Sequence, residues 1–284
     1  MSSHKKFLKK CIYVAVVVVV LALAVCVYYA KIKQNSTTEK KQENRTPEVT
    51  ESFPQEQNKK GCVIFLHSGG FVVEKNEYHE QFGKALGEQL GYDYLVPDYP
   101  IYQSYEETLA YMEDIYAETM KKYDSVLMIG CSAGANLAVS SMICYGEEYG
   151  MPDGLILMSP WLDTSMENEE ITCVSDFDKE FFTSLVEWGK QYNKGDTETP
   201  LASPVKVEKE QLKHFPGTVM VVGDQDILRF DAQKFQSKLE EADVKVTYLT
   251  AEGKNHGEVF AEYAATYMMP EIMNEALEIV MHND

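Results

Sequence analysis

The chain has 284 residues, 45% of them hydrophobic and 25% charged, so it is long and apolar enough to fold around a substantial core and is not disordered overall. Acidic residues outnumber basic ones by 45 to 26, and because residues 1–60 hold 11 of the basic residues and only five glutamates, residues 61–284 carry 40 acidic against 15 basic side chains. This acidity argues against a nucleic-acid partner or an anionic-lipid surface for the main part of the chain.

The first sixty residues predict a membrane anchor and a tether. Residues 1–10 form a basic tail, and residues 11–30, CIYVAVVVVVLALAVCVYYA, contain no charged side chain over a length that crosses about 30 Å of hydrocarbon as a helix. A cleaved signal peptide is the alternative, but no small-x-small cleavage site follows, and the residue before Cys26 is a valine rather than the small residue of a lipidation site. Residues 31–60 are polar and aperiodic, as in a tether.

We therefore expect a single-pass protein at the cell membrane, held there by its N-terminal helix. Lysines flank the span on both sides, and the orientation we favour puts the main domain, residues 61–284, outside the cytoplasm. The sequence contains no signal for the oligomeric state.

Short apolar runs alternate with amphipathic stretches after residue 60. The runs are CVIFL (62–66), YLV (94–96), SVLMI (125–129), GLILM (154–158), TVMVV (218–222) and VKVTYL (244–249). Helical spacing is found over 78–90, in a stretch that opens at the capping box Ser104–Glu107, and over 133–149, 178–192, 230–242 and 257–281. Continuous apolar strands that alternate with helices predict an α/β fold with a mostly parallel sheet covered on both faces.

One interval is too long for an ordinary connection. About sixty residues separate the strand that ends at Met158 from the one that starts near Thr218. Residues of about 163–200 within it are predicted to form a small lid insertion that helps to select the substrate.

Reactive groups in an open parallel sheet gather at the carboxyl ends of its strands. GCSAG follows the run 125–129 and leads into a helix, so Ser132 has the position of a nucleophile on a sharp strand-to-helix turn. A packing serine in such a turn is the alternative. HSGGF follows the run 62–66, where Gly69 and Gly70 would offer backbone N–H groups to an oxyanion, together with that of Ala133. A glycine turn beside a structural His67 is the alternative there.

The last two strands are followed by an acid and a base. Asp226 in GDQDILR is the candidate that orients the base, with Asp224 as a turn cap and Asp231 as a solvent-facing helical residue. Of the six histidines, only His256 lies in a loop beyond the final strand, whereas His79 lies in a predicted helix near the start of the domain. Serine, aspartate and histidine thus follow one another in the chain order typical of α/β-hydrolases, at the strand ends where that chemistry requires them.

Seven motifs resemble the hormone-sensitive lipase-type family of α/β-hydrolases, in register over roughly 61–260. They are HSGGF, VPDYP, GCSAGANLA, SPWLD, PLASPV, GDQDILR and NHGEVF. The resemblance implies an α/β-hydrolase fold and a carboxylic-ester hydrolase, with Ser132 as nucleophile, Asp226 as orienting acid, His256 as base, and Gly69, Gly70 and Ala133 as oxyanion donors. Two departures stand out. Ser68 replaces the first glycine of the family's H-G-G-G pattern, and an anchor and tether replace the N-terminal cap segment.

The predicted activity is hydrolysis of short-chain acyl esters through an acyl-enzyme, without metal or cofactor. The alternatives are a deacetylase of surface polysaccharide, an amidase or peptidase of the same fold, or a catalytically silent anchored binding domain. Of the six cysteines, Cys62, Cys131, Cys144 and Cys173 lie outside the predicted span and show no C-x-x-C pair, so we expect buried free thiols.

Overall fold

Six parallel strands form one sheet within residues 60–282, the part of the chain that the computed structural model describes. In chain order they are β1 (Gly61–Leu66), β2 (Asp93–Leu95), β3 (Ser125–Cys131), β4 (Gly154–Met158), β5 (Gly217–Gly223) and β6 (Val246–Ala251). Their spatial order is β2-β1-β3-β4-β5-β6, so the direction of winding reverses between β1 and β3. Ligands of open α/β sheets bind at such a reversal, beyond the carboxyl ends of the strands.

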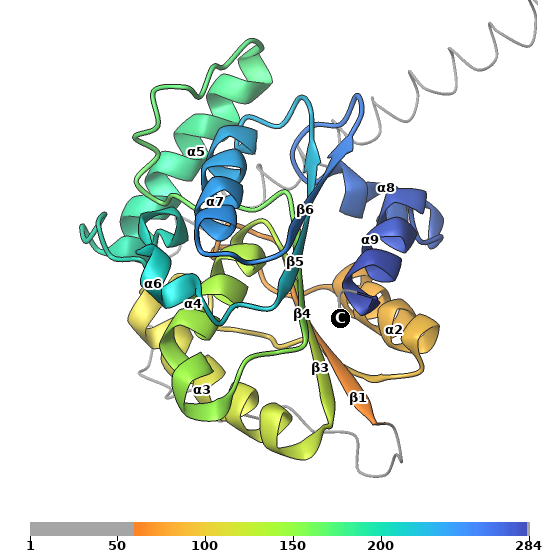
Figure 1. The fold of residues 1–284 in the computed structure, drawn as a ribbon. Coiled ribbons are helices and arrows are strands. Elements are labelled where there is room, and N and C mark those ends of the chain that lie inside the picture. The colour runs from red at the N-terminus through yellow and green to blue at the C-terminus, as the bar shows by residue number, and fades with distance from the viewer. Residues whose placement is uncertain (1–59, 283–284) are drawn as a thin grey trace, which may run out of the picture. The chain divides into compact units, whose positions relative to one another are not determined.

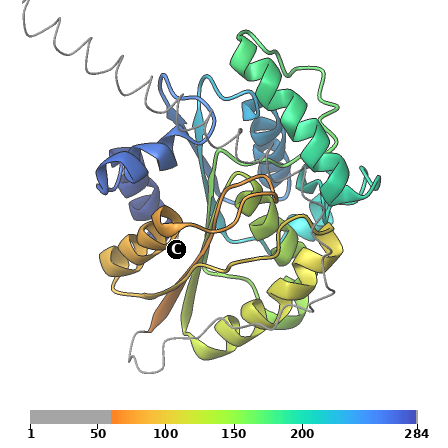
Figure 2. The ribbon, with the colours of Figure 1, turned by 180° about the vertical axis from the view of Figure 1, so that it is seen from behind.

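Helices cover both faces of the sheet, as Figures 1 and 2 show from opposite sides. They are α2 (Glu77–Leu90), α3 (Tyr105–Lys122), α4 (Ala133–Tyr149), α5 (Asp176–Asn193), α6 (Lys209–Leu212), α7 (Arg229–Glu241), α8 (Glu258–Thr266) and α9 (Glu271–Met281). In β1, Val63 and Phe65 pack with α2, α8 and α9, whereas Ile64 and Leu66 pack with α3, α4 and α7. Burial of both faces explains the continuous apolar runs and confirms the predicted α/β fold with a parallel sheet covered on both faces.

Two predicted boundaries were wrong. The helix predicted over 257–281 is two helices, because Tyr267 ends α8 in a left-handed conformation (φ 54°) and Pro270, which has no N–H to donate, precedes α9. The last strand begins at Val246 rather than Val244, because the N–H of Val244 is already used in a bond to the carbonyl of Leu239 at the end of α7.

The predicted lid insertion, 163–200, holds α5. Its helix begins with a capping box in which the Ser175 side chain accepts the N–H of Asp178 and the Asp178 carboxylate accepts the N–H of Ser175. Figure 1 draws α5 at the same end of the sheet as the arrowhead of β6, which is the end where the candidate reactive residues lie.

Three other predictions concern the anchor and the cysteines. The basic tail, membrane span and tether predicted before residue 60 lie outside the described residues and stay predictions. Over residues 60–282, none of the helices has both the length and the apolar character that a bilayer crossing requires. Cys62 and Cys131 are buried free thiols as expected, but Cys144 is exposed and Cys173 half-buried, so the prediction of burial was wrong for these two.

Candidate active site

Ser132 lies on a strained turn between β3 and α4. Its backbone has φ 54° and ψ −115°, a left-handed conformation that a serine adopts only where the surrounding structure holds it. Its N–H donates to the carbonyl of Met158 at 2.9 Å, and its own carbonyl accepts the N–H of Trp161 at 3.2 Å. Bonds to the end of β4 and to the segment that follows it therefore support the turn, and they aim the Ser132 side chain at the carboxyl end of the sheet.

The two glycines of GCSAG are required by close packing. A Cβ on Gly130 would overlap the backbone of Ala135 in the first turn of α4. A Cβ on Gly134 would overlap the backbone carbonyls of Leu66 and His67, where β1 enters the HSGGF loop. The spacing G-x-S-x-G thus brings the start of α4 directly against the HSGGF loop.

Ser132, His256 and Asp226, predicted from three separate strand ends, form one hydrogen-bonded chain. His256 Nε2 lies 2.8 Å from Ser132 Oγ, and His256 Nδ1 lies 3.0 Å from Asp226 Oδ2 and 3.2 Å from Asp226 Oδ1. A carboxylate can only accept, so Nδ1 carries the proton and Nε2 presents its lone pair to the serine hydroxyl. This tautomer is the one that a general base for Ser132 requires.

Asp226 is fully buried and held as a carboxylate. Burial alone would raise its pKa, but the electrostatic interaction and hydrogen bond with His256, the N–H of Leu228 and the Ser159 hydroxyl together lower it. Ser159 also accepts the N–H of Gly257 at 3.2 Å and so links the acid to the loop of the base. Asp224, the alternative acid, has its side chain at the surface, where it accepts the N–H of Gly253 at 2.8 Å.

The HSGGF loop lies beside Ser132 in a conformation that suits glycine. Gly69 and Gly70 have φ values of 133° and 62°, in the region that disfavours side chains. Ala133 is the first residue of α4, so its N–H has no carbonyl in its own helix to bind. The three predicted donors therefore belong to two neighbouring backbone segments, which meet where Gly134 touches the carbonyls of Leu66 and His67.

The lid helix α5 covers this site with two aromatic side chains that the sequence did not single out. The ring of Phe181 lies 4.7 Å from that of His256, measured between centroids. The indole of Trp188 packs so tightly on Gly70 that a Cβ there would overlap it. Phe181 and Trp188 lie seven positions apart, about two helical turns, and so share one face of α5. That spacing was the signal available in the sequence.

An ion pair and a backbone hydrogen bond at Lys254 support the loop that carries His256. Lys254 Nζ lies 2.7 Å from Glu262 Oε2 on α8, and the Lys254 carbonyl accepts the N–H of Gln225 at 3.0 Å, next to Asp226.

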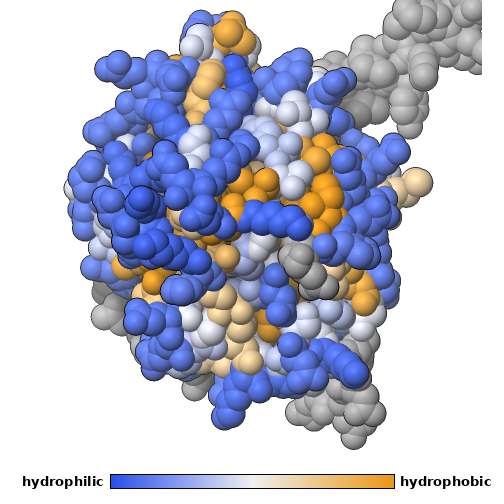
Figure 3. Space-filling model, viewed as in Figure 1, coloured by the Kyte–Doolittle hydropathy of each residue, from blue (hydrophilic) through white to orange (hydrophobic). Residues whose placement is uncertain are grey.

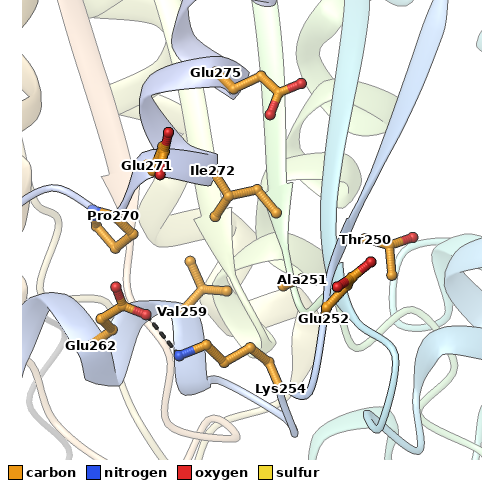
Figure 4. Close-up of a pocket in the computed structure, with 10 residues that line it drawn as sticks. All are labelled: Thr250, Ala251, Glu252, Lys254, Val259, Glu262, Pro270, Glu271, Ile272 and Glu275. Atoms are coloured by element: carbon orange, nitrogen blue, oxygen red, sulfur yellow. Dashed lines mark hydrogen bonds and ion pairs between the residues drawn. The ribbon is translucent and has the colours of Figure 1, made fainter.

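Figure 4 shows this ion pair in a cavity of about 350 Å³ whose lining comes from β6, α8 and α9. The lining includes four glutamates and none of Ser132, Asp226 and His256, so the cavity is separate from the candidate active site. Around β6, Figure 3 shows hydrophobic side chains among mostly hydrophilic ones.

Neither a metal centre nor a reactive thiol accompanies the three residues in the described structure. Over residues 60–282, no three His, Cys, Asp or Glu side chains converge as metal ligands would. Burial raises the pKa of Cys131 to about 12, so the thiol next to Ser132 stays protonated and unreactive at neutral pH.

Two buried histidines beside the HSGGF loop make acid stability a test of the structure. Burial lowers the pKa of His67 to about 4, against a hydrogen bond to the Ser68 carbonyl and the charge of Asp98, and it lowers that of His79 to about 3, with the charges of His67 and Lys75 adding to the effect. A histidine in the unfolded chain has a pKa of about 6.5. Between pH 6.5 and 4 the unfolded state therefore binds more protons than the folded state, and the free energy of unfolding decreases as the pH falls.

Asp231 acts in the opposite direction, because burial raises its pKa to about 6 and its carboxyl takes up a proton in the folded state first. The destabilisation from the two histidines on acidification is larger than the stabilisation from this one carboxyl group. We expect the free energy of unfolding to fall by about 3 kcal/mol between pH 7 and pH 4.5. Urea unfolding at the two pH values measures it, and a stability that stays level or rises on acidification would contradict the buried, neutral histidines.

Comparison with known proteins gives one family match over most of the chain. Residues 63–260 match a family model described as the alpha/beta hydrolase fold. Among curated proteins, an esterase of Acinetobacter venetianus is 28% identical over 192 residues, which cover 66% of this chain and 63% of that protein. An acetyl-hydrolase of Streptomyces hygroscopicus is 25% identical over 195 residues, covering 66% of this chain and 64% of that protein. The chain thus spans less than two thirds of the length of these relatives.

Solved structures with the same fold include two hydrolases. A thermostable esterase from Pseudomonas putida superposes with a TM-score of 0.68 at 21% identity, over 81% of this chain and 76% of that one. A hormone-sensitive lipase from a metagenome library has a TM-score of 0.69 at 22% identity, over 79% of each chain. At these identities the likeness establishes the fold alone.

Proposed function

This chain belongs to the α/β-hydrolase family, and we propose that it is a serine hydrolase that cleaves carboxylic esters of short acyl chains. The observation that carries the proposal is the hydrogen-bonded chain from Asp226 through His256 to Ser132 Oγ. The chain order Ser, Asp, His and the strained turn at Ser132 are those of an α/β-hydrolase nucleophile.

The proposed reaction proceeds through an acyl-enzyme. His256 Nε2 takes the proton of Ser132 as its oxygen attacks the ester carbonyl, and the carbonyl oxygen becomes an oxyanion that accepts N–H bonds from Gly69, Gly70 and Ala133. Collapse of this intermediate expels the alcohol, which takes its proton from His256. Water, deprotonated in turn by His256, then attacks the acyl-enzyme and releases the acid and Ser132.

The preference for short acyl chains rests on the lid. Trp188 lies against Gly70 and Phe181 against His256, so aromatic side chains restrict the space beside both the oxyanion donors and the base. The relative from Streptomyces hygroscopicus is named an acetyl-hydrolase, which agrees with a small acyl group.

Hydrolysis of p-nitrophenyl esters from acetate to decanoate by the purified full-length chain tests the proposal. We expect kcat/KM to be greatest for acetate or butyrate and to fall at least about tenfold by octanoate, because a longer acyl chain must push aside the packed side chains of Phe181 and Trp188 in order to bind. Activity that rises with chain length would contradict the short-chain preference. A folded protein that cleaves no ester but does cleave aminoacyl amides would assign it to the amidases of this fold.

A further inference from the structure

His79 contacts the oxyanion loop although it lies on a different element. It is a residue of α2, it is 3% exposed, and its Nε2 lies 3.3 Å from the Ser68 hydroxyl oxygen. Ser68 is the residue that replaces the first glycine of the family's H-G-G-G pattern, immediately before Gly69 and Gly70. The departure in the sequence and this contact therefore concern the same side chain.

The hydrogen bonds of His79 determine which of its nitrogens carries the proton. The backbone N–H of Asn76 points at His79 Nδ1 from 3.2 Å, in the capping box of α2. A backbone N–H only donates, so Nδ1 is the acceptor, and a neutral imidazole then carries its proton on Nε2. His79 thus donates to Ser68 Oγ.

The Ser68 hydroxyl, which is held by His79, also lies close to the end of the strand that leads to Ser132. Because Oγ accepts from His79, its own proton is free to be donated, and the Ser68 hydroxyl lies near enough to the Cys131 thiol to lower the pKa of that thiol against the effect of burial. Cys131 directly precedes Ser132. One hydroxyl therefore joins α2 to the first position of the oxyanion loop, next to the end of β3, which a glycine could not do.

Two aromatic rings stack on the His79 imidazole. His67 lies 4.9 Å from it between ring centroids, and Phe260 lies at the same distance. Phe260 belongs to α8, four positions after His256. His67, in turn, stacks on Tyr99 at 4.1 Å. The imidazole of His79 thus contacts both His67, at the start of the oxyanion loop, and Phe260 of α8, the helix that follows His256.

We propose that His79 is a positioning residue that fixes the oxyanion loop through the Ser68 hydroxyl. The inference rests on the proposed function, since it assigns the loop the task of binding an oxyanion. The restraint matters most when charge develops on the substrate oxygen, because amides that are held in place stabilise that charge without reorganising. Loss of the restraint therefore slows turnover more than it weakens substrate binding.

Paired substitutions separate this role from a structural one. His79→Asn keeps an acceptor for the Asn76 N–H but is too short to reach Ser68, whereas His79→Gln carries an N–H donor at about the position of Nε2. Ser68→Ala removes the hydroxyl alone. We measure kcat and KM for p-nitrophenyl acetate with full-length protein, together with the rate at which a fluorophosphonate labels Ser132.

His79→Asn and Ser68→Ala are each expected to lower kcat and the labelling rate about tenfold, with KM within twofold. Their combination should cost no more than either change alone, and His79→Gln should restore most of the loss. Wild-type kcat in His79→Asn, or a double variant that loses the product of the two single effects, overturns the proposal.

If His79→Asn does not fold, Ser68→Ala decides: a tenfold loss of kcat at unchanged KM supports the proposal, and wild-type kcat overturns it. A wild-type chain that neither cleaves esters nor is labelled at Ser132 defeats the proposed function, and this inference with it. A Ser132-dependent esterase that is indifferent to His79→Asn defeats the inference alone.

Discussion

Replacing Ser132 by alanine is expected to lower kcat for ester hydrolysis by a factor of about 10⁴ to 10⁶ while the protein stays folded. The reason is that Oγ forms the acyl bond in the proposed reaction, and no other hydroxyl lies within hydrogen-bond distance of His256 Nε2 among the described residues. Alanine keeps the Cβ of serine, so the strained turn at φ 54° is no harder to form. Only one hydrogen bond is lost, which is worth about 1 kcal/mol.

Ser141→Ala is the matched control for this variant. Ser141 lies on the same helix, α4, is fully buried, and its hydroxyl has no partner among residues 60–282. Its removal should leave kcat unchanged and stability level or slightly higher. Titration with p-nitrophenyl acetate in a burst experiment measures both variants, and turnover by Ser132→Ala above about one percent of wild type would remove Ser132 from the role of nucleophile.

Asp226→Asn is expected to lower kcat by about 10⁴-fold, and Asp224→Asn by less than about twofold. The Asp226 carboxylate accepts the hydrogen bond of His256 Nδ1–H, with Oδ2 at 3.0 Å and Oδ1 at 3.2 Å from that nitrogen. An asparagine amide would donate to Nδ1 instead, and the imidazole would then turn its N–H toward Ser132 and lose its ability to accept the hydroxyl proton. Asp224 only accepts the N–H of Gly253 at the surface, a bond that an asparagine oxygen retains.

The pH dependence of kcat/KM provides a second comparison of the Asp226→Asn and Asp224→Asn variants. Asp224→Asn should keep the wild-type profile, whereas Asp226→Asn should lose activity at every pH, because a change of tautomer is not restored by titration. A large loss in Asp224→Asn together with an active Asp226→Asn would move the orienting acid to Asp224.

Much of the fold was predictable because its signals are local. Each strand is a short apolar run, and most helices show a 3.6-residue spacing or a capping box, as at Ser104. The two wrong boundaries show the limit of such signals. Val244 has the composition of a strand residue, yet its N–H is used to close α7. The stretch 257–281 has helical periodicity throughout, yet it turns at Tyr267.

The sequence by itself determined the order of the strands along the chain, the strand ends that carry Ser132, Asp226 and His256, and the glycines of the HSGGF loop, because each of these follows from neighbours within a few positions. Only the tertiary structure decided that Phe181 and Trp188 cover the site and that His79, dismissed as a helical residue, touches Ser68. Those contacts depend on how separate helices pack over the end of the sheet, and the spacing of residues along the chain does not record that packing.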